Sequence, residues 1–139
     1  MNMKPVLITL SFTLATLLLH GQDKKEVIEK GIQVKRNYET DIANGEKEAS
    51  LEKEEYYNFR GDLVEIKEYD NSGKGITSWF KYKYDNQGEL IEELELNAKG
   101  EQKERAEYKY ENGLKTEKLI YDSKNRLSKK KTFKYELRK

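Results

Sequence analysis

The segment Tyr84-Asp-Asn-Gln-Gly88-Glu-Leu90-Ile91-Glu92 decides the fold, because its first half recurs along the chain. In most copies a tyrosine is followed four residues later by glycine or asparagine. The full-length copies are Tyr57-Asn-Phe-Arg-Gly61, Tyr69-Asp-Asn-Ser-Gly73 and Tyr121-Asp-Ser-Lys-Asn125, with Leu96-Asn-Ala-Lys-Gly100 and the shorter Tyr110-Glu-Asn-Gly113 between them. Successive copies are 12 to 15 residues apart. A fixed period of this kind predicts a repeat architecture.

The repeated segment has the chemistry of a tight turn. An Asp or Asn side chain bonds to its own backbone, and glycine adopts positive φ at little steric cost. Asn125 fits the same position, since asparagine tolerates this conformation best after glycine. Each turn therefore joins two β-strands, and the repeating unit is a hairpin of about 26 residues, from Gly61 to Gly88 and from Gly88 to Gly113.

Alternation between the turns indicates strands, because successive side chains of a strand leave on opposite faces. One set comprises Ile76, Ser78, Phe80, Tyr82 and Tyr84, and the other Thr77, Trp79, Lys81 and Lys83. The pattern returns as Ala106, Tyr108 and Tyr110 against Arg105, Glu107 and Lys109. We predict an all-β protein, an antiparallel meander of β-hairpin repeats that forms a single twisted open sheet of seven or eight strands.

The upstream part of the repeat domain is less regular. Asn44-Gly45 predicts a two-residue hairpin turn between strands at Gln33 to Asp41 and Lys47 to Phe59. Residues 46–58 are also rich in helix-forming Glu and Lys, so a helix competes with the second strand. The strand is favoured because Ala49, Leu51, Tyr57 and Phe59 share parity.

The N-terminal residues have the features of an export signal. Lys4 precedes an apolar run from Val6 to Leu19, which is too short for a bilayer span, and the small residue Gly21 stands where signal peptidase would cut. We predict a signal peptide at 1–21 cleaved after Gly21, a flexible lead-in at 22–30 with one helical turn, and the repeat domain at 31–139. The protein would then be periplasmic or extracellular, with no membrane span after cleavage.

Composition excludes several functions. Without residues 1–21, 26 basic and 26 acidic residues remain, and this balance argues against nucleic-acid binding. The only histidine is removed with the signal and the chain has no cysteine, which excludes His- and Cys-dependent catalysis and ordinary zinc sites. We predict no catalytic residues, no metal and no cofactor.

The turn segments resemble the tyrosine–aspartate (YD) repeats of Rhs-like bacterial wall-associated and toxin-delivery proteins. Tyr84-Asp-Asn-Gln-Gly88-Glu-Leu90 matches the family pattern, whereas Gly75 replaces its leucine and Asn125 its glycine in two other copies. The similarity covers about residues 55–137, and the chain is also similar to small exported repeat proteins of Bacteroidetes. The resemblance implies a β-ribbon of hairpins, and for some members carbohydrate binding.

The aromatic residues provide the candidate binding site. Phe80, Tyr82, Tyr84, Tyr108 and Tyr110, here called the aromatic strip, belong to the two longest aromatic strands and share parity within each. The strip is either the hydrophobic core of a thin protein or, where uncovered, a platform for a glycan or an envelope protein.

The sequence favours a non-catalytic binding or structural module of the envelope or extracellular space. The alternatives are a carbohydrate-active enzyme that uses paired carboxylates such as Glu92, Glu93 and Glu95, and an accessory or immunity-like partner of a secreted repeat toxin. Charge pairs on a solvated strand explain these glutamates more simply.

Overall fold

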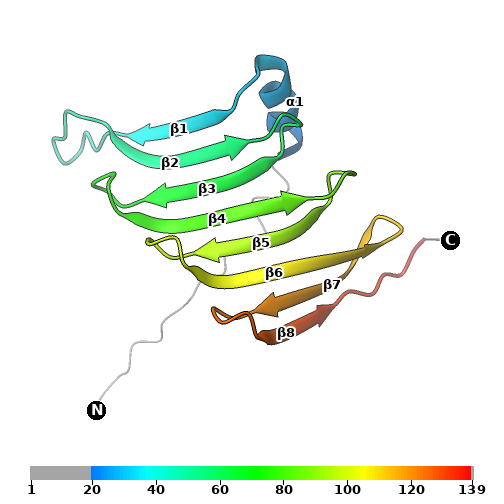
Figure 1. Ribbon diagram of the computed structural model, residues 1–139. Coiled ribbons are helices and arrows are strands. Elements are labelled where there is room, and N and C mark those ends of the chain that lie inside the picture. The colour runs from blue at the N-terminus through cyan, green and yellow to red at the C-terminus, as the bar shows by residue number, and fades with distance from the viewer. Residues whose placement is uncertain (1–19, 139) are drawn as a thin grey trace, which may run out of the picture.

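The computed structural model describes residues 20–138, so the predicted signal segment lies outside the described residues except for its last two positions. One helix precedes eight antiparallel strands in a single sheet whose spatial order follows the chain from β1 to β8 (Figure 1). The elements are α1 (His20–Lys30), β1 (Val34–Glu39), β2 (Ser50–Tyr57), β3 (Leu63–Tyr69), β4 (Ile76–Tyr84), β5 (Leu90–Leu96), β6 (Gln102–Glu111), β7 (Leu114–Tyr121) and β8 (Leu127–Thr132). The predicted open meander is confirmed.

The repeated turns are built alike. The Asp85 carboxylate oxygen Oδ1 accepts the backbone N–H groups of Gln87 at 2.8 Å and Glu89 at 2.9 Å. The Gly88 N–H donates to the Asp85 carbonyl at 3.1 Å. Equivalent side-chain acceptors stand at Asn58, Asp70, Asn97 and Asp122. Asn125, in the glycine position of the last turn, has φ of 60°. The predicted turn chemistry is therefore confirmed.

We expect the Asp85 carboxylate to stabilise its turn through these two hydrogen bonds. Asp85→Ala should lower the free energy of unfolding by about 1–2 kcal/mol, because two backbone donors lose their acceptor. Asp85→Asn should change it by less than about 0.5 kcal/mol, since an amide oxygen already accepts the equivalent bonds at Asn97. Urea denaturation of both variants measures the difference, and equal losses would contradict a role for the acceptor.

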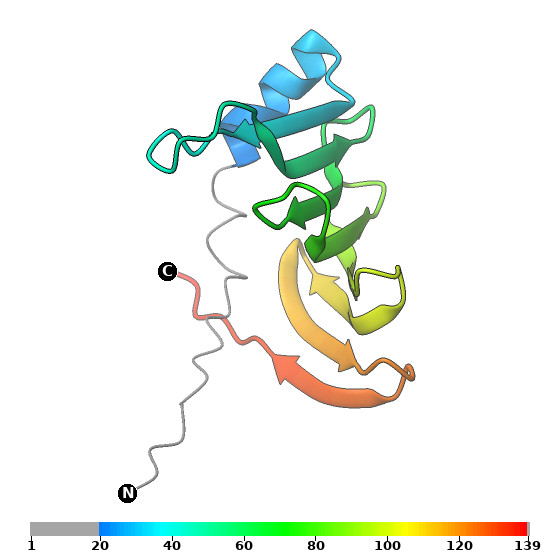
Figure 2. The same ribbon diagram turned by 90° about the vertical axis from the view of Figure 1, so that its left-hand side faces the viewer.

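Each hairpin contains a β-bulge that the sequence analysis missed. Tyr84 pairs with Leu90 and Lys83 with Glu92, so Ile91 has no residue opposite it. The equivalent extra residues of the other hairpins are Glu52, Val64, Thr77, Lys103, Thr116 and Ser128. Bulges increase the local twist, and the sheet is strongly curled in Figure 2. The bulge at Thr77 also interrupts the alternation that was predicted between Ile76 and Ser78.

The first hairpin confirms the strand and corrects the turn. Residues 50–57 are strand β2, not helix. The prediction of a two-residue turn at Asn44-Gly45 is wrong, because a ten-residue loop, residues 40–49, separates β1 from β2. Within this loop the Asp41 carboxylate accepts the Asn44 N–H at 3.0 Å. Phe59 lies in the following turn and is 93% exposed, so it takes no part in the alternation of β2.

Residues 22–30 are helical instead of a flexible lead-in with one helical turn. Helix α1 ends at Gly31, where the Ile32 N–H donates to the Val27 carbonyl at 2.9 Å, a bond typical of a glycine-terminated helix. Val27 is buried. The helix packs so closely on the β2–β3 turn that a Cβ at Gly61 would lie 2.9 Å from Ile28 Cγ1. Helix propensity was present in the sequence, but this contact with a distant turn was not visible there.

Candidate functional site

All five residues of the aromatic strip lie on one face of the sheet, here called the tyrosine face. On β5, Glu93 pairs with Tyr82 of β4 and with Ala106 of β6, so β5 separates the two aromatic strands. Leu90, Ala106, Tyr108 and Ile120 form a cluster of the buried core, and Tyr82, Tyr84 and Tyr110 pack against it. The structure therefore brings the strip together, and much of it contributes to the hydrophobic core.

Two tyrosines of the strip use their hydroxyl groups to hold the sheet. The Tyr84 hydroxyl donates to the Leu63 carbonyl and the Tyr110 hydroxyl to the Leu90 carbonyl, both at 2.8 Å. Tyr135 makes the same bond to Lys115 at 2.7 Å. Burial, followed by nearby carboxylates, raises the pKa of Tyr84 and Tyr110 to about 12. The Tyr84 and Tyr110 bonds each join the end of one strand to the beginning of the preceding strand, so these hydroxyls are structural.

Tyr108 is enclosed by charged neighbours. Lys115 Nζ lies 4.1 Å and Lys118 Nζ 5.1 Å from the centre of its ring. Burial is the main cause of the raised Tyr108 pKa, and the Glu93 carboxylate adds to it. Burial and the neighbouring Lys118 lower the pKa of Lys115. Tyr108 is only 9% exposed, so a ligand on this face would contact the lysines around it and not its ring.

The side chains of Phe80 and Tyr82 make no hydrogen bond to the backbone of the described sheet, although Tyr82 packs against the core as Tyr84 and Tyr110 do. Their rings stack with centroids 6.4 Å apart and planes 16° apart, and both side chains are partly exposed. Among the described residues, no hydrogen bond is recorded for the Tyr82 hydroxyl. Burial, and then the charge of Glu93, raises the pKa of Tyr82. This stacked pair offers a flat apolar surface with one hydroxyl available for a ligand.

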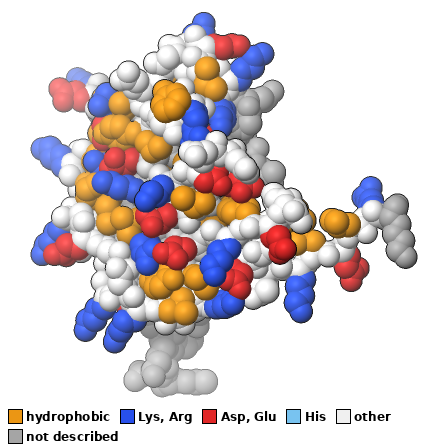
Figure 3. Space-filling model, turned by 45° about the vertical axis from the view of Figure 1, so that its right-hand side comes forward, with side chains coloured by type: hydrophobic (Ala, Val, Ile, Leu, Met, Phe, Trp, Pro, Cys, Tyr) orange, Lys and Arg blue, Asp and Glu red, His pale blue; other side chains and the backbone are white. Residues whose placement is uncertain are grey.

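The opposite face, here called the charged face, carries ordered ion pairs. Trp79 lies there as predicted, and its Nε1–H donates to Glu65 at 2.7 Å while Lys67 Nζ lies 4.5 Å from its ring. Arg105 stacks on Tyr121 and pairs with Glu107. In the view of Figure 3, hydrophobic side chains are interspersed with charged ones. On this face, many charged side chains are therefore paired with an oppositely charged side chain or an aromatic ring.

Glu54 is a buried carboxylate of this face that the sequence analysis did not single out. It accepts the Tyr69 hydroxyl at 2.7 Å, the Arg36 Nε–H at 2.8 Å and the Tyr56 hydroxyl at 3.1 Å. The Tyr69 hydrogen bond is the main reason why the Glu54 pKa is lowered. A buried carboxylate with this many donors is fully satisfied, so Glu54 is a structural group.

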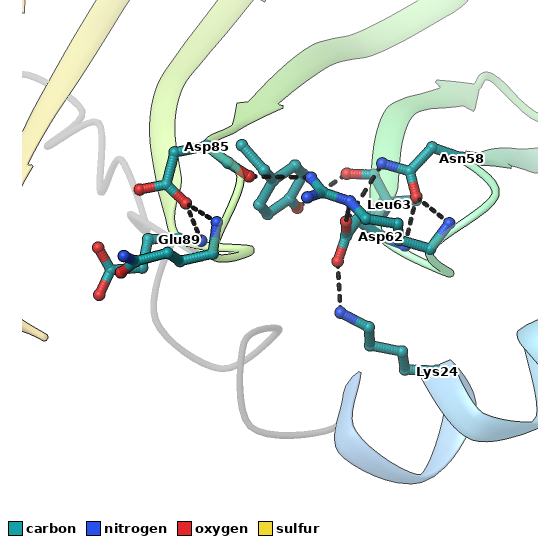
Figure 4. A network of polar contacts seen from close by, with 9 residues as sticks. Lys24, Asn58, Asp62, Leu63, Asp85 and Glu89 are labelled. Atoms are coloured by element: carbon teal, nitrogen blue, oxygen red, sulfur yellow. Dashed lines mark hydrogen bonds and ion pairs between the residues drawn. The ribbon is translucent and has the colours of Figure 1, made fainter.

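A second buried carboxylate, Asp62, fastens the helix to the sheet. Figure 4 shows it between Lys24 of α1 and Asn58 of the same turn. Lys24 Nζ lies 2.5 Å from its carboxylate, and Asn58 and Arg60 approach the other oxygen at 3.2 and 3.3 Å. Burial raises the pKa of Asp62, but these neighbours outweigh it and the net pKa is lowered. The feature that sets Asp62 apart within its turn is this bond to Lys24, which is 38 residues away in the sequence.

The glutamates considered for catalysis are already engaged. Glu92 lies 3.5 Å from Arg105 Nη1, and Glu95 pairs with Lys103. Glu93 lies between Tyr82 and Ala106 on the tyrosine face and contacts Tyr108. Glu92 and Glu93 are adjacent on one strand, so their side chains point to opposite faces of the sheet. These two carboxylates therefore do not converge on one substrate.

One hollow of the surface has an acidic lining. A cavity of about 170 Å³ lies between loop 40–49 and the β3–β4 turn. Its lining comprises Glu39, Asp41, Asn44, Glu46, Ser50, Glu52, Tyr69, Asp70 and Asn71. The Asp70 carboxylate is occupied by the Ser72 hydroxyl and backbone N–H. Within residues 20–138 no group of three or more His, Cys, Asp or Glu side chains is placed to hold a metal ion.

The described part of the chain contains no helix that is long and apolar enough to cross a membrane. No protein-family model matches the chain, and no curated protein matches it at a significant level.

Proposed function

We propose that this protein is an exported, non-catalytic binding module of the cell envelope or extracellular space, which binds an extended glycan or envelope protein at the stacked pair of Phe80 and Tyr82. The single observation that carries this proposal is the division of the aromatic strip. Tyr108 is buried and the Tyr84 and Tyr110 hydroxyls bind backbone carbonyls, whereas Phe80 and Tyr82 stack on each other and, among the described residues, the Tyr82 hydroxyl makes no hydrogen bond.

Two further features favour binding of an extended partner. The sheet is a single layer of eight strands, so the pair lies on an extended surface. The ion pairs of Glu92 and Glu95 also favour binding over glycoside hydrolysis, which needs two carboxylates on either side of a substrate. The resemblance of the turns to YD repeats, some of which are ascribed carbohydrate binding, points the same way.

The test compares folded variants against glycan arrays and against proteins captured from envelope extract. Phe80→Ala/Tyr82→Ala should weaken binding by about thirtyfold or more, the effect of losing an aromatic hot spot. Tyr121→Ala is the matched control, because it removes a partly exposed tyrosine from the charged face. Tyr108 is left in place because it belongs to the buried core. Unchanged binding by the folded double variant would refute this site.

Export has its own test. The proposed cleavage after Gly21 would leave a mature chain that begins at Gln22 and keeps most of α1. N-terminal sequencing or mass spectrometry of protein from the periplasm and medium should find this end. Intact protein with Met1 in the cytoplasmic fraction alone would contradict export.

A further inference from the structure

Strand β8 ends the sheet with an open edge. It pairs with β7 on one side, and no described strand pairs with its other side. In Figures 1 and 2 it forms the lower rim of the sheet. All six of its residues are exposed. An edge strand of this kind presents unpaired backbone N–H and C=O groups to which another extended segment can bind.

The charge of β8 is strongly one-sided. Its side chains include Lys129, Lys130 and Lys131 and no carboxylate. Lys130 pairs with Glu117 of β7 at 2.5 Å. Among the described residues neither Lys129 nor Lys131 has an ion-pair partner, and Lys131 stands opposite Lys118 in the register. Like charges in directly opposite positions destabilise a sheet, so an acidic neighbour on the open side would relieve this arrangement.

A second copy of the chain does not provide that neighbour. The other edge strand, β1, has Glu39 as its only carboxylate and carries Lys35 and Arg36. Those two cations are already paired with Glu55 and Glu54 of β2. Addition of β1 from a second copy would therefore bring only one carboxylate to β8, and pairing of two β8 strands would set lysines against lysines.

We propose that the open edge of β8 binds an extended acidic segment of another protein, which adds to the sheet as a ninth strand. Carboxylates of that segment would lie beside Lys129 and Lys131, and its backbone would complete the hydrogen bonding of β8. Leu127 and Phe133, which are 56% and 36% exposed, flank the lysines and provide apolar contacts at the two ends. This edge is separate from the Phe80–Tyr82 pair.

The probe is a labelled peptide of about eight alternating glutamate and valine residues, the length of an ordinary strand. We expect saturable binding by fluorescence anisotropy that weakens as salt is added. A lysine–valine peptide and a glutamate–valine peptide interrupted by proline should each bind at least about tenfold more weakly, because one repels β8 and the other cannot form the backbone ladder.

Charge-reversed proteins complete the test. Lys129→Glu/Lys131→Glu should weaken binding of the acidic peptide by about tenfold and strengthen binding of the lysine–valine peptide. Lys81→Glu/Lys83→Glu, with the same spacing on the interior strand β4, should change neither. The proposal is overturned if the control variant loses as much affinity, if the proline peptide binds equally well, or if anionic phospholipid vesicles bind and the peptide does not. None of these outcomes depends on the Phe80–Tyr82 site.

Discussion

Gly73→Ala is expected to lower the free energy of unfolding by about 2–5 kcal/mol, roughly twice the cost of Gly88→Ala. Both glycines occupy the same position of the repeated turn and have positive φ, 69° and 83°. They differ in what surrounds them. A Cβ at Gly73 would lie 2.8 Å from the backbone N and 3.3 Å from the backbone O of Leu51, whereas nothing lies within 4 Å of one at Gly88.

The extra cost at Gly73 arises because backbone must move. Leu51 belongs to β2 and pairs with Tyr38 of β1, so relief of the clash displaces the first hairpin. At Gly88 only the backbone strain of about 1–3 kcal/mol remains, and Gly88→Val should likewise cost more than about 1 kcal/mol. Lys81→Gln, on an exposed strand position, should cost less than about 0.5 kcal/mol. Denaturant titration measures all four variants, and equal losses at the two glycines would refute the close contact with Leu51.

Alkaline pH is expected to destabilise the protein through the tyrosine face. Burial raises the pKa of Tyr82 and Tyr108 above the ordinary value of 10. Above pH 10 the unfolded chain therefore loses these protons before the folded chain does. Stability is complete below pH 10 and falls as the pH rises toward the folded-state pKa values. At pH 11 each of these two groups should contribute a loss of about 1 kcal/mol.

Tyr82→Phe separates this effect from the deprotonation of lysines. The Tyr82 hydroxyl has no recorded hydrogen bond to a described residue, so the variant should be about as stable as the original protein at pH 7. At pH 11 it should be more stable by about 1 kcal/mol, because one titrating group is gone. Urea denaturation at pH 7, 10 and 11, with tyrosinate absorbance followed in parallel, provides the measurement. An identical pH dependence in both proteins would mean that Tyr82 ionises as freely when folded as when unfolded.

The candidate site was foreseen in its composition but not in its division of roles. Alternation placed Phe80, Tyr82 and Tyr84 on one face, and the same rule grouped Tyr108 with Tyr110. It could not tell which hydroxyls would reach a carbonyl, since Leu63 and Leu90 are 21 and 20 residues from their tyrosine partners. The buried carboxylates Glu54 and Asp62 were missed for the same reason, because each has at least one donor far away in the sequence: Arg36 and Tyr69 for Glu54, and Lys24 for Asp62.

The sequence by itself determined the meander, because its turns depend on contacts within five or six residues. Asp85 and Gly88, for example, select the turn through one side-chain acceptor and one backbone conformation, and five of the seven neighbouring pairs of strands follow from such a turn. The tertiary structure alone decided the bulge in each hairpin and the docking of α1 at Gly61. These features depend on how closely backbone segments from separate parts of the chain approach one another. The residue type at one position does not specify the distance between such segments.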